Sequence, residues 1–426
     1  MRITRQFGSL RKLIQSNPFN FAKAVVNPYE PFPPKPTPPV PPLPPVFPPK
    51  FVGINLGGFD AGNAVTIQEA TYSCISDQQM EWIKASGVNI VRCPIIPAYI
   101  FKEPPTEFTE YSADLFSAIW TDGMGDEVNP CGDNDNVWNV STYMSAIKFL
   151  VNNKMNVIID AHENLHHLCT FGGQESMTPG VFQTMWKLIA TYIIENVPDD
   201  KYVWFELFNE PVAGENCQEI SPTDWNNNYV IPTIQAIREV EGIFVKHHIL
   251  VTTWGNYSGL HLWVEDGTLQ GLVDALVQNG YEDTEKSKIL IAGHQYCDSN
   301  YSGTGQGCDA QTFNANLYNQ WINQTSQILT PAKLKWFMSE GNVNCGYETN
   351  CNEMNGNLFI EFLNTVVLSE ACSGFSVWLS NLGDNYQGQN MGGGPQTQPN
   401  LFDAYKVIYP YSGNVYNFSA FFPLYT

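Results

Sequence analysis

Two glutamates follow short apolar runs 130 positions apart in the chain, and their setting suits paired acid and nucleophile chemistry. The first run ends at Phe208 and leads to Glu210, and the second ends at Met338 and leads to Glu340. A retaining glycosidase requires one protonated carboxyl group and one ionised carboxylate, held about 5–5.5 Å apart. The two glutamates therefore predict cleavage of a glycosidic bond, provided that the fold brings the two ends together.

Other polar or aromatic side chains also follow apolar runs. The second, third, sixth and eighth runs lead to residues that can bind, orient or stack against a ligand: Arg92, His162, His294, Tyr296 and Trp378. Asn209 immediately precedes Glu210, and Trp254 directly follows the fifth run. In a barrel of parallel strands the reactive groups stand at the carboxyl ends of the strands, so these residues form one predicted site.

The runs recur every 38–67 residues and alternate with helix-like patterns. Eight runs predict strands: Phe51–Leu56, Asn89–Pro94, Asn156–Ala161, Tyr202–Phe208, His248–Thr253, Ile289–Gly293, Lys335–Met338 and Gly374–Leu379. Six segments with helical periodicity lie between them: Asp77–Ala85, Thr142–Asn153, Val181–Glu195, Trp225–Glu239, Thr312–Gln324 and Asn357–Leu368. This alternation indicates an α/β protein with a parallel sheet, and eight repeats indicate a closed (β/α)8 TIM barrel.

Composition divides the chain of 426 residues into three expected parts. Residues 1–27 form a basic tail, and residues 28–50 are rich in proline, which favours an extended, disordered polyproline linker. Residues 51–426 then form a single catalytic domain, since 43% apolar residues supply a large core. A proline-rich ligand for an SH3-type partner is the alternative interpretation of the linker.

The formal net charge of −21 narrows the choice of partners. A negative field repels nucleic acid and anionic membrane surfaces, so we expect neither as a partner. The 13% aromatic residues suit a neutral polyol, whose C–H faces stack on rings. We expect a monomer that binds a neutral polysaccharide.

Ten cysteines without a C-x-x-C pair argue against zinc ribbons and thioredoxin-like chemistry. Close pairs such as Cys297 with Cys308 and Cys345 with Cys351 favour disulfides that staple loops in an oxidising compartment. The apolar stretches in residues 1–29 are too short for the hydrophobic core of a signal peptide. We expect an extracellular protein whose signal is missing from this sequence or whose export is unconventional.

The two glutamate runs, with the residues at the other strand ends, resemble glycoside hydrolase family 5, the family of many cellulases. The resemblance covers about residues 51–410, and the opening Gly53–Asp60 is similar to fungal-type endo-β-1,4-glucanases of the family. The resemblance implies a retaining, endo-acting hydrolysis of β-1,4-glucan by double displacement, without a metal or another cofactor. Glu210 would be the general acid/base and Glu340 the nucleophile.

The resemblance also implies roles for the surrounding residues. Asn209 would bond the sugar 2-hydroxyl, and Arg92 and Tyr296 would hold Glu340 ionised and oriented. His162 and His294 would line the cleaved subsite, and Trp378 would form the floor under its sugar. Glu206 lies at even spacing from Glu210, so we expect it to point into the barrel as a buried structural carboxylate.

Aromatic residues in loops are candidates for further sugar subsites, although core packing explains them equally well. They are Trp138, Trp225, Trp254, Tyr257, Trp263 and Tyr386, of which Trp254 is the best placed.

Three alternatives remain open at the level of sequence. The first is the same mechanism acting on mannan, xyloglucan or mixed-linkage glucan, which this family also hydrolyses. A non-catalytic carbohydrate-binding barrel is a second possibility, although such proteins usually lack one carboxylate and this chain has both. The third is a zinc peptidase through His162-Glu163-x-x-His166, a motif that requires a helix, whereas here it follows a predicted strand.

Overall fold

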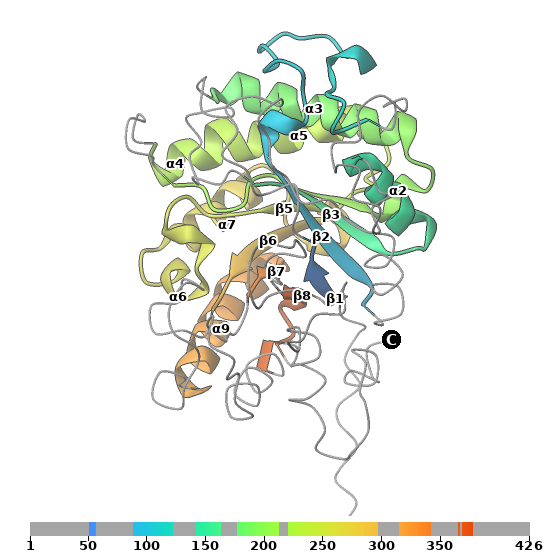
Figure 1. Ribbon diagram of the computed structural model, residues 1–426. Helices are drawn as coiled ribbons and strands as arrows, with labels where there is room; N and C mark the ends of the chain where they lie inside the picture. Colours follow the sequence, from blue (N-terminus) through green and yellow to red (C-terminus); the bar gives the residue numbers. More distant parts are fainter. Residues whose placement is uncertain are drawn as a thin grey trace, which may run out of the picture. The chain divides into compact units, whose positions relative to one another are not determined.

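A computed structural model describes residues 51–56, 88–121, 142–162, 177–212, 220–296, 315–341, 365–366 and 369–377. The described strands form a closed parallel barrel in which each strand pairs with the next along the chain and β8 pairs with β1 (Figure 1). The strands are β1 (Phe51–Asn55), β2 (Ile90–Ile95), β3 (Asn156–Ala161), β4 (Val203–Glu206), β5 (Ile249–Val251), β6 (Ile289–His294), β7 (Lys335–Glu340) and β8 (Cys372–Val377). This confirms the predicted (β/α)8 fold.

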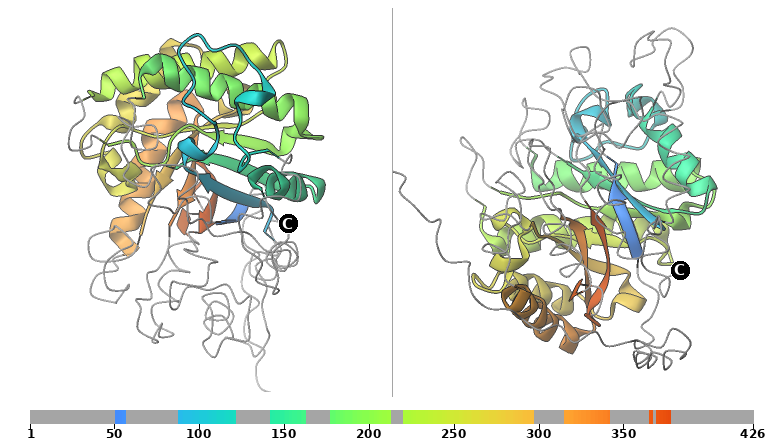
Figure 2. Two further views of the ribbon diagram at one scale, coloured as in Figure 1. Left: turned by 45° about the horizontal axis from the view of Figure 1, so that its top comes forward. Right: turned by 60° about the horizontal axis from the view of Figure 1, so that its bottom comes forward.

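Helices cover the outside of the barrel (Figures 1 and 2). The longer ones are α2 (Tyr143–Asn152), α3 (Pro179–Asn196), α5 (Ile231–Glu241), α7 (Thr268–Gln278) and α9 (Ala315–Leu329). Shorter ones are α4 (Pro222–Asp224), the π-helical turn Trp225–Val230, α6 (Leu260–Trp263) and α8 (Thr284–Ser287). The 3-10 turns are Pro97–Tyr99, Ala113–Leu115, Asp200–Tyr202, Asn256–Ser258 and Thr330–Ala332.

Four of the six predicted helices are confirmed, namely those at α2, α3, α5 and α9. The predicted helix 77–85 lies outside the described residues, as does most of 357–368. Helix α7 was not among the predicted helices, although its apolar residues repeat at helical spacing and are buried: Leu269, Leu272, Val273 and Leu276. The predicted tail 1–27 and linker 28–50 also lie outside the described residues.

The barrel interior has an apolar layer below a polar layer. Six strands contribute one residue to each layer at a spacing of two: Ile90 and Arg92, Ile158 and Asp160, Trp204 and Glu206, Leu250 and Thr252, Ala292 and His294, and Phe337 and Ser339. Side chains two positions apart on a strand point to the same side, so each strand places a polar group above its apolar one. The polar layer lies toward the carboxyl ends of the strands, where the predicted site residues stand.

An irregularity in strand pairing aligns two of the site residues. The register between β6 and β7 shifts after Gly293, which leaves His294 opposite Glu340. Gly293 is needed here because a Cβ at this position would overlap the ring of the buried Trp263. The close approach of Trp263 to the strand therefore depends on glycine.

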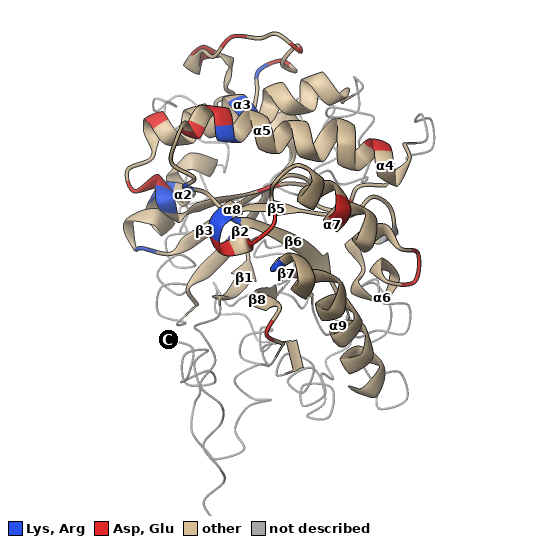
Figure 3. Ribbon diagram, turned by 180° about the vertical axis from the view of Figure 1, so that it is seen from behind, with Lys and Arg blue, Asp and Glu red and all other residues tan. Residues whose placement is uncertain are grey.

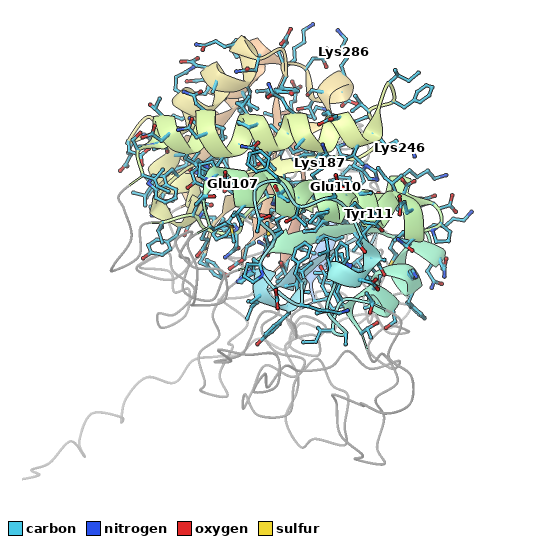
Figure 4. All side chains as sticks on the ribbon, turned by 90° about the horizontal axis from the view of Figure 1, so that it is seen from above. Glu107, Glu110, Tyr111, Lys187, Lys246 and Lys286 are labelled. Atoms are coloured by element: carbon cyan, nitrogen blue, oxygen red, sulfur yellow. The ribbon has the colours of Figure 1, made fainter. Side chains whose placement is uncertain are left out.

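The segment of residues 96–121, which follows β2, lies along α3. Phe101 and Phe116 form an antiparallel bridge across it, and Thr184 of α3 donates a hydrogen bond of 2.9 Å to the carbonyl of Glu107. Figure 4 shows Glu107 and Tyr111 of this segment beside α3. The segment thereby covers the outer face of a barrel helix.

Within the described part of the chain, no helix has the length and apolar character needed to cross a lipid bilayer. Acidic residues are spread over several helices and loops of the described chain, with few Lys and Arg among them (Figure 3).

Candidate active site

A single buried arginine, Arg92 of β2, organises the polar layer. Its Nε and Nη2 bind Glu206 at 2.6 and 3.3 Å, and Nη2 also lies 2.9 Å from Asp160 Oδ2. All three side chains are fully buried. The guanidinium therefore forms a two-pronged bond to one carboxylate and a close ion pair with another.

The remaining donors of Arg92 reach the predicted catalytic residues. Its Nη1 donates to Glu340 Oε2 at 3.1 Å and to Asn55 Oδ1 at 2.9 Å, and its Nη2 donates to Asn209 Oδ1 at 2.7 Å. Arg92 is thus bonded both to the residue before Glu210 and to Glu340. One side chain fixes the orientation of groups on β4 and β7.

Burial and neighbouring charges have opposite effects on the pKa values of this cluster. Burial alone would lower the pKa of Arg92, but Asp160, Glu206 and Glu340 outweigh it and raise the pKa above its ordinary value. Burial raises the pKa of Glu206 to about 7, against the opposing pull of Arg92. The structure places Glu206 inside the barrel, as its spacing from Glu210 indicates.

Glu340 is held from two sides at the end of β7. The Tyr296 hydroxyl donates to Glu340 Oε1, and Arg92 donates to Oε2. Glu340 remains 7% exposed, while Arg92 beneath it is fully buried. Both carboxylate oxygens are therefore oriented, and the group still reaches the surface of the site.

Glu210 faces Glu340 across His294. His294 Nδ1 lies 2.6 Å from Glu210 Oε1 and 3.8 Å from Glu340 Oε2. One carboxylate oxygen of each glutamate and a ring nitrogen of His294 lie within 4.8 Å of one another. Burial, opposed by Glu340, lowers the pKa of His294 to about 4, so the ring is neutral near neutral pH.

Asn209 and His162 form a second row beside Glu210. His162 Nδ1 lies 2.8 Å from Asp160 Oδ2, and His162 Nε2 lies 3.4 Å from Asn209 Nδ2. Burial would lower the pKa of His162, but Asp160 raises it to about 9. The amide nitrogen of Asn209 is a donor and therefore favours an unprotonated Nε2 on His162. Asp160 favours the protonated, charged ring, so the two neighbours have opposite effects on its protonation.

Two supporting residues, Asn55 and Asp160, were not among the predicted site residues. Asn55 of β1 donates to the carbonyls of Ser339 and Ser376 at 3.1 and 3.3 Å, which ties β1 to β7 and β8. Asp160 binds both Arg92 and His162. Both residues lie at the ends of predicted strands, and this position was the signal available in the sequence.

The aromatic candidates fall into different environments. Trp225 and Trp263 are fully buried, so they belong to the core. Trp254 is 8% exposed, and its ring centroid lies 5.7 Å from that of Trp225. Tyr257 is 55% exposed. Three of the sequence-predicted residues lie outside the described residues, namely Trp378, Trp138 and Tyr386.

The donor set of Glu210, His294 and Glu340 is close enough to hold a metal ion. However, the Arg92 guanidinium is bonded to one of these donors, and its charge opposes a second cation. Of the zinc-peptidase motif, Glu163 and His166 lie outside the described residues, while His162 follows β3 directly. The imidazole of His162 already contacts Asp160 and Asn209.

A closed (β/α)8 barrel with two facing carboxyl groups at the carboxyl ends of its strands defines the class of barrel glycoside hydrolases. The family model described as cellulase (glycosyl hydrolase family 5) matches residues 54–378. The chain belongs to this family and is a glycoside hydrolase, which confirms the resemblance and the predicted enzyme class.

Individual relatives are distant. Endoglucanase 1 of Saitozyma flava is 24% identical over 334 residues, which cover 78% of this chain and 81% of that protein. Among solved structures, XacCel5A in complex with cellopentaose has a TM-score of 0.55 at 21% identity, covering 80% of this chain and 92% of the other. Cel5A (EG2) from Hypocrea jecorina has a TM-score of 0.54 at 17% identity, with the same coverage. These structures share the barrel fold.

Proposed function

We propose that the protein is a retaining, endo-acting β-1,4-glucanase in which Glu340 is the nucleophile and Glu210 the general acid/base. The observation that carries the proposal is the approach of their carboxylate oxygens to within 4.8 Å. A retaining enzyme holds its carboxyl groups about 5–5.5 Å apart, whereas an inverting enzyme needs about 6.5–9.5 Å to admit a water molecule. The separation supports direct attack by a carboxylate.

The unequal surroundings of the two glutamates support this division of roles. Glu340 receives hydrogen bonds from Arg92 and Tyr296, both of which stabilise a carboxylate. Glu210 contacts a neutral His294, and either partner of that contact can carry the proton. Glu340 is therefore suited to attack, and Glu210 to transfer a proton.

The reaction then has two balanced steps. Glu210 gives its proton to the glycosidic oxygen while Glu340 attacks the anomeric carbon, so the C–O bond breaks and a glycosyl ester forms. The ionised Glu210 next takes a proton from water, whose oxygen displaces Glu340 from the same carbon. The second displacement restores both glutamates and retains the anomeric configuration, without a metal or another cofactor.

The remaining site residues orient the sugar in this proposal. Asn209, held through its Oδ1 by Arg92, presents its Nδ2 toward the 2-hydroxyl, and His162 and His294 line the cleaved subsite. Trp378 provides the floor, and Trp254 contributes at the end of β5. We retain these roles from the resemblance to the family.

We infer β-1,4-glucan as the substrate from two relatives. Endoglucanase 1 of Saitozyma flava is named for cleavage within glucan chains, and XacCel5A was solved with cellopentaose. Mannan, xyloglucan and mixed-linkage glucan are the competing substrates. Initial rates on soluble forms of all four polymers give kcat/KM for each substrate. We expect the largest kcat/KM on β-1,4-glucan. A higher value on another polymer would reassign the substrate while leaving the mechanism in place.

The stereochemistry and the acid/base role have direct tests. Proton NMR of the first product should show the β-anomer before mutarotation, whereas an initial α-anomer excludes double displacement. The Glu210→Ala variant should retain cleavage of a dinitrophenyl glycoside, which needs little protonation, and azide should rescue its turnover as a β-glycosyl azide. An equal loss on dinitrophenyl glycoside and cello-oligomers would remove Glu210 from this role.

We further propose an extracellular, monomeric enzyme with disulfides. Cys93 and Cys372 are buried free thiols among the described residues, and the predicted pairs Cys297 with Cys308 and Cys345 with Cys351 lie outside them. Thiol titration of the denatured, unreduced protein from its native source should find most of the ten cysteines oxidised. Ten free thiols would contradict both the disulfides and the location.

A further inference from the structure

A polar pocket lies outside the barrel, between α7 and the turns that precede α5 (Figure 1). It has a volume of about 310 Å³, and residues of α4, the π-helical turn Trp225–Val230 and α7 line it. None of the described residues that line it belongs to the candidate active site. Its hydrogen-bonding side chains include Thr223, Asn226, Asn227, Asp274 and Gln278.

Asn226 brings a buried, unpaired amide to this pocket. The residue is only 4% exposed, yet it is one of those that line the pocket. Within the described part of the chain, no hydrogen bond reaches its side chain. A side-chain amide has two donor hydrogens and an acceptor oxygen, and leaving them unpaired in the interior is costly. The amide therefore points to a partner that enters the pocket.

The π-helical turn directs this amide toward α7. Trp225, the preceding residue, is fully buried, and its indole donates a hydrogen bond of 2.8 Å to the carbonyl of Thr252 after β5. The amide nitrogen of Asn226 instead lies against α7, 3.8 Å from the position that a Cβ would take on Gly271. Turns of this type are rare in proteins and occur frequently at functional sites.

Gly271 leaves open the space in front of the amide. It is exposed in the middle of α7, and its backbone is not in the left-handed region. An added Cβ would meet only the Asn226 amide, at an ordinary contact distance, so neither the backbone nor the packing requires glycine here. Glycine in a helix interior is less stable than alanine. The missing side chain thus keeps the pocket open at a cost in helix stability.

The walls of the pocket fit a neutral, hydroxyl-rich ligand. Neither α4 nor α7 contains Lys or Arg, and each carries an acidic residue, which disfavours an anion (Figure 3). The described residues form no group of three acidic, His or Cys ligands at this place, which disfavours a metal ion. Amides donate and accept hydrogen bonds and carboxylates accept them, as the adjacent hydroxyls of a sugar require.

We propose that this pocket is a second sugar-binding site, separate from the active site, for a unit of a β-linked glucan. The choice of glucan rests on the proposed function. Two weak sites on one protein bind a polymer more tightly than either does alone, because the second contact is intramolecular. The pocket therefore holds the enzyme on the polymer and takes no part in cleavage.

The side-chain amide signals of Asn226 in NMR spectra test the contact directly. The full chain with Glu340→Gln, which is expected to bind sugar without cleaving it, is prepared with isotope-labelled asparagine and titrated with cellotriose. The signals of Asn226, identified by their loss in Asn226→Asp, should shift and saturate. Calcium chloride, titrated separately, should leave them in place.

Two substitutions of the same glycine provide the blocked pocket and its control. Gly271→Leu fills the space in front of the amide and should abolish the shift, whereas Gly271→Ala adds one methyl group and should retain it. Both replace glycine by a better helix former, so both should melt at or above the wild-type temperature.

Polymer binding and turnover separate the pocket from the active site. In affinity electrophoresis through soluble β-1,4-glucan, with Glu340→Gln present, Gly271→Leu should bind about 3- to 10-fold more weakly than Gly271→Ala, the loss expected for one or two hydrogen bonds. With Glu340 intact, both variants should have the wild-type kcat/KM on cellotetraose, because the pocket shares no residue with the active site.

Several outcomes would overturn the second site. No shift with cellotriose would mean that the pocket holds only water, and a shift with calcium alone would make it a cation site. A shift that persists in Gly271→Leu, or equal losses in polymer binding and in turnover of cellotetraose, would place the effect in the active site. A wild-type enzyme that cleaves no glucan overturns the proposed function by itself, whereas the titration of Asn226 decides the pocket.

Discussion

Two charge clusters lie at opposite ends of the barrel, and each pairs an arginine with carboxylates. The upper cluster, at the carboxyl ends of the strands, contains one arginine and three carboxylates: Arg92, Asp160, Glu206 and Glu340. The lower cluster, at the amino ends, contains Arg238, Glu241, His247, Lys246 and Asp200. The balance of charge differs between them.

The lower cluster pairs its charges closely. Arg238 Nη1 lies 2.6 Å from Glu241 Oε2, and its Nη2 donates to the carbonyls of His247 and Ser287 at 3.1 and 2.9 Å. His247 Nδ1 lies 2.6 Å from Glu241 Oε1. These bonds connect α5 to the entries of β5 and β6, where they hold the scaffold together.

The two clusters shift the pKa of their buried glutamates, Glu241 and Glu206, in opposite directions. Burial would raise the pKa of Glu241, but His247 and Arg238 lower it, so Glu241 is held in its charged form. In the upper cluster, burial and the neighbouring Asp160 raise the pKa of Glu206, and the opposing effect of Arg92 does not cancel them. We therefore propose that the upper cluster, which holds Glu340 beside Glu210, is the reactive one, and that the lower cluster is structural.

The largest expected effect is the loss of the nucleophile. Glu340→Gln should lower kcat by about 10⁴-fold or more, as for removal of other covalent nucleophiles, while folding is nearly unchanged. Steady-state rates and a thermal melt measure the two quantities. Substantial residual activity in a clean preparation would show that the upper cluster is not the reactive one.

Removing each arginine compares the clusters directly. Arg92→Met leaves three buried carboxylates uncompensated and should lower the free energy of unfolding by about 3–5 kcal/mol. Arg238→Met, at a side chain that is 12% exposed, should lower it by about 1–3 kcal/mol and leave kcat nearly unchanged. Denaturant unfolding and steady-state kinetics test both variants. A greater destabilisation in Arg238→Met would reverse the comparison.

Glu206 gives the upper cluster a pH dependence of stability. Its pKa rises from 4.5 to about 7 on folding, so between these values the folded protein holds the proton more strongly and stability falls as pH increases. A single such group contributes a slope of at most about 1.4 kcal/mol per pH unit. Glu206→Gln should flatten the unfolding free energy between pH 5 and 7. An unchanged slope would show that Glu206 is ionised in the folded state.

His247 makes a smaller contribution in the lower cluster. Burial lowers its pKa, but Asp200 and Glu241 outweigh this and raise it, so its stabilisation is complete below about pH 6.5 and is lost as pH rises through the folded pKa. His247→Gln should therefore cost about 1–2 kcal/mol at pH 5.5 and less at pH 9. A cost independent of pH would indicate that packing alone, without charge, accounts for the residue.

The smallest effect is expected outside both clusters. Residues 1–49 have no core-forming pattern, so their deletion should leave kcat/KM on soluble glucan unchanged. The same assay applied to the full chain is the control. A large loss would mean that the tail contributes to the catalytic domain.

Sequence periodicity was sufficient for the fold because its signals are local. Apolar runs such as Asn156–Ala161 coincide with β3, and a regular spacing between runs implies the closed barrel. Boundaries were less accurate: the run predicted at Gly374–Leu379 corresponds to β8 at Cys372–Val377, since pairing with neighbouring strands sets the ends. The helix α7 was absent from the predicted set although its pattern is clear.

The sequence by itself determined which residues end the strands, because strand polarity and a spacing of two follow from the covalent chain. Glu210, Glu340 and Arg92 were identified in this way. Only the tertiary structure decided that Arg92 is shared by Asp160, Glu206 and Glu340, that His294 stands opposite Glu340, and that Tyr257 is exposed while Trp254 is largely buried. Those properties depend on distances between residues far apart in sequence and on the burial that sets their charge, and no local pattern encodes either.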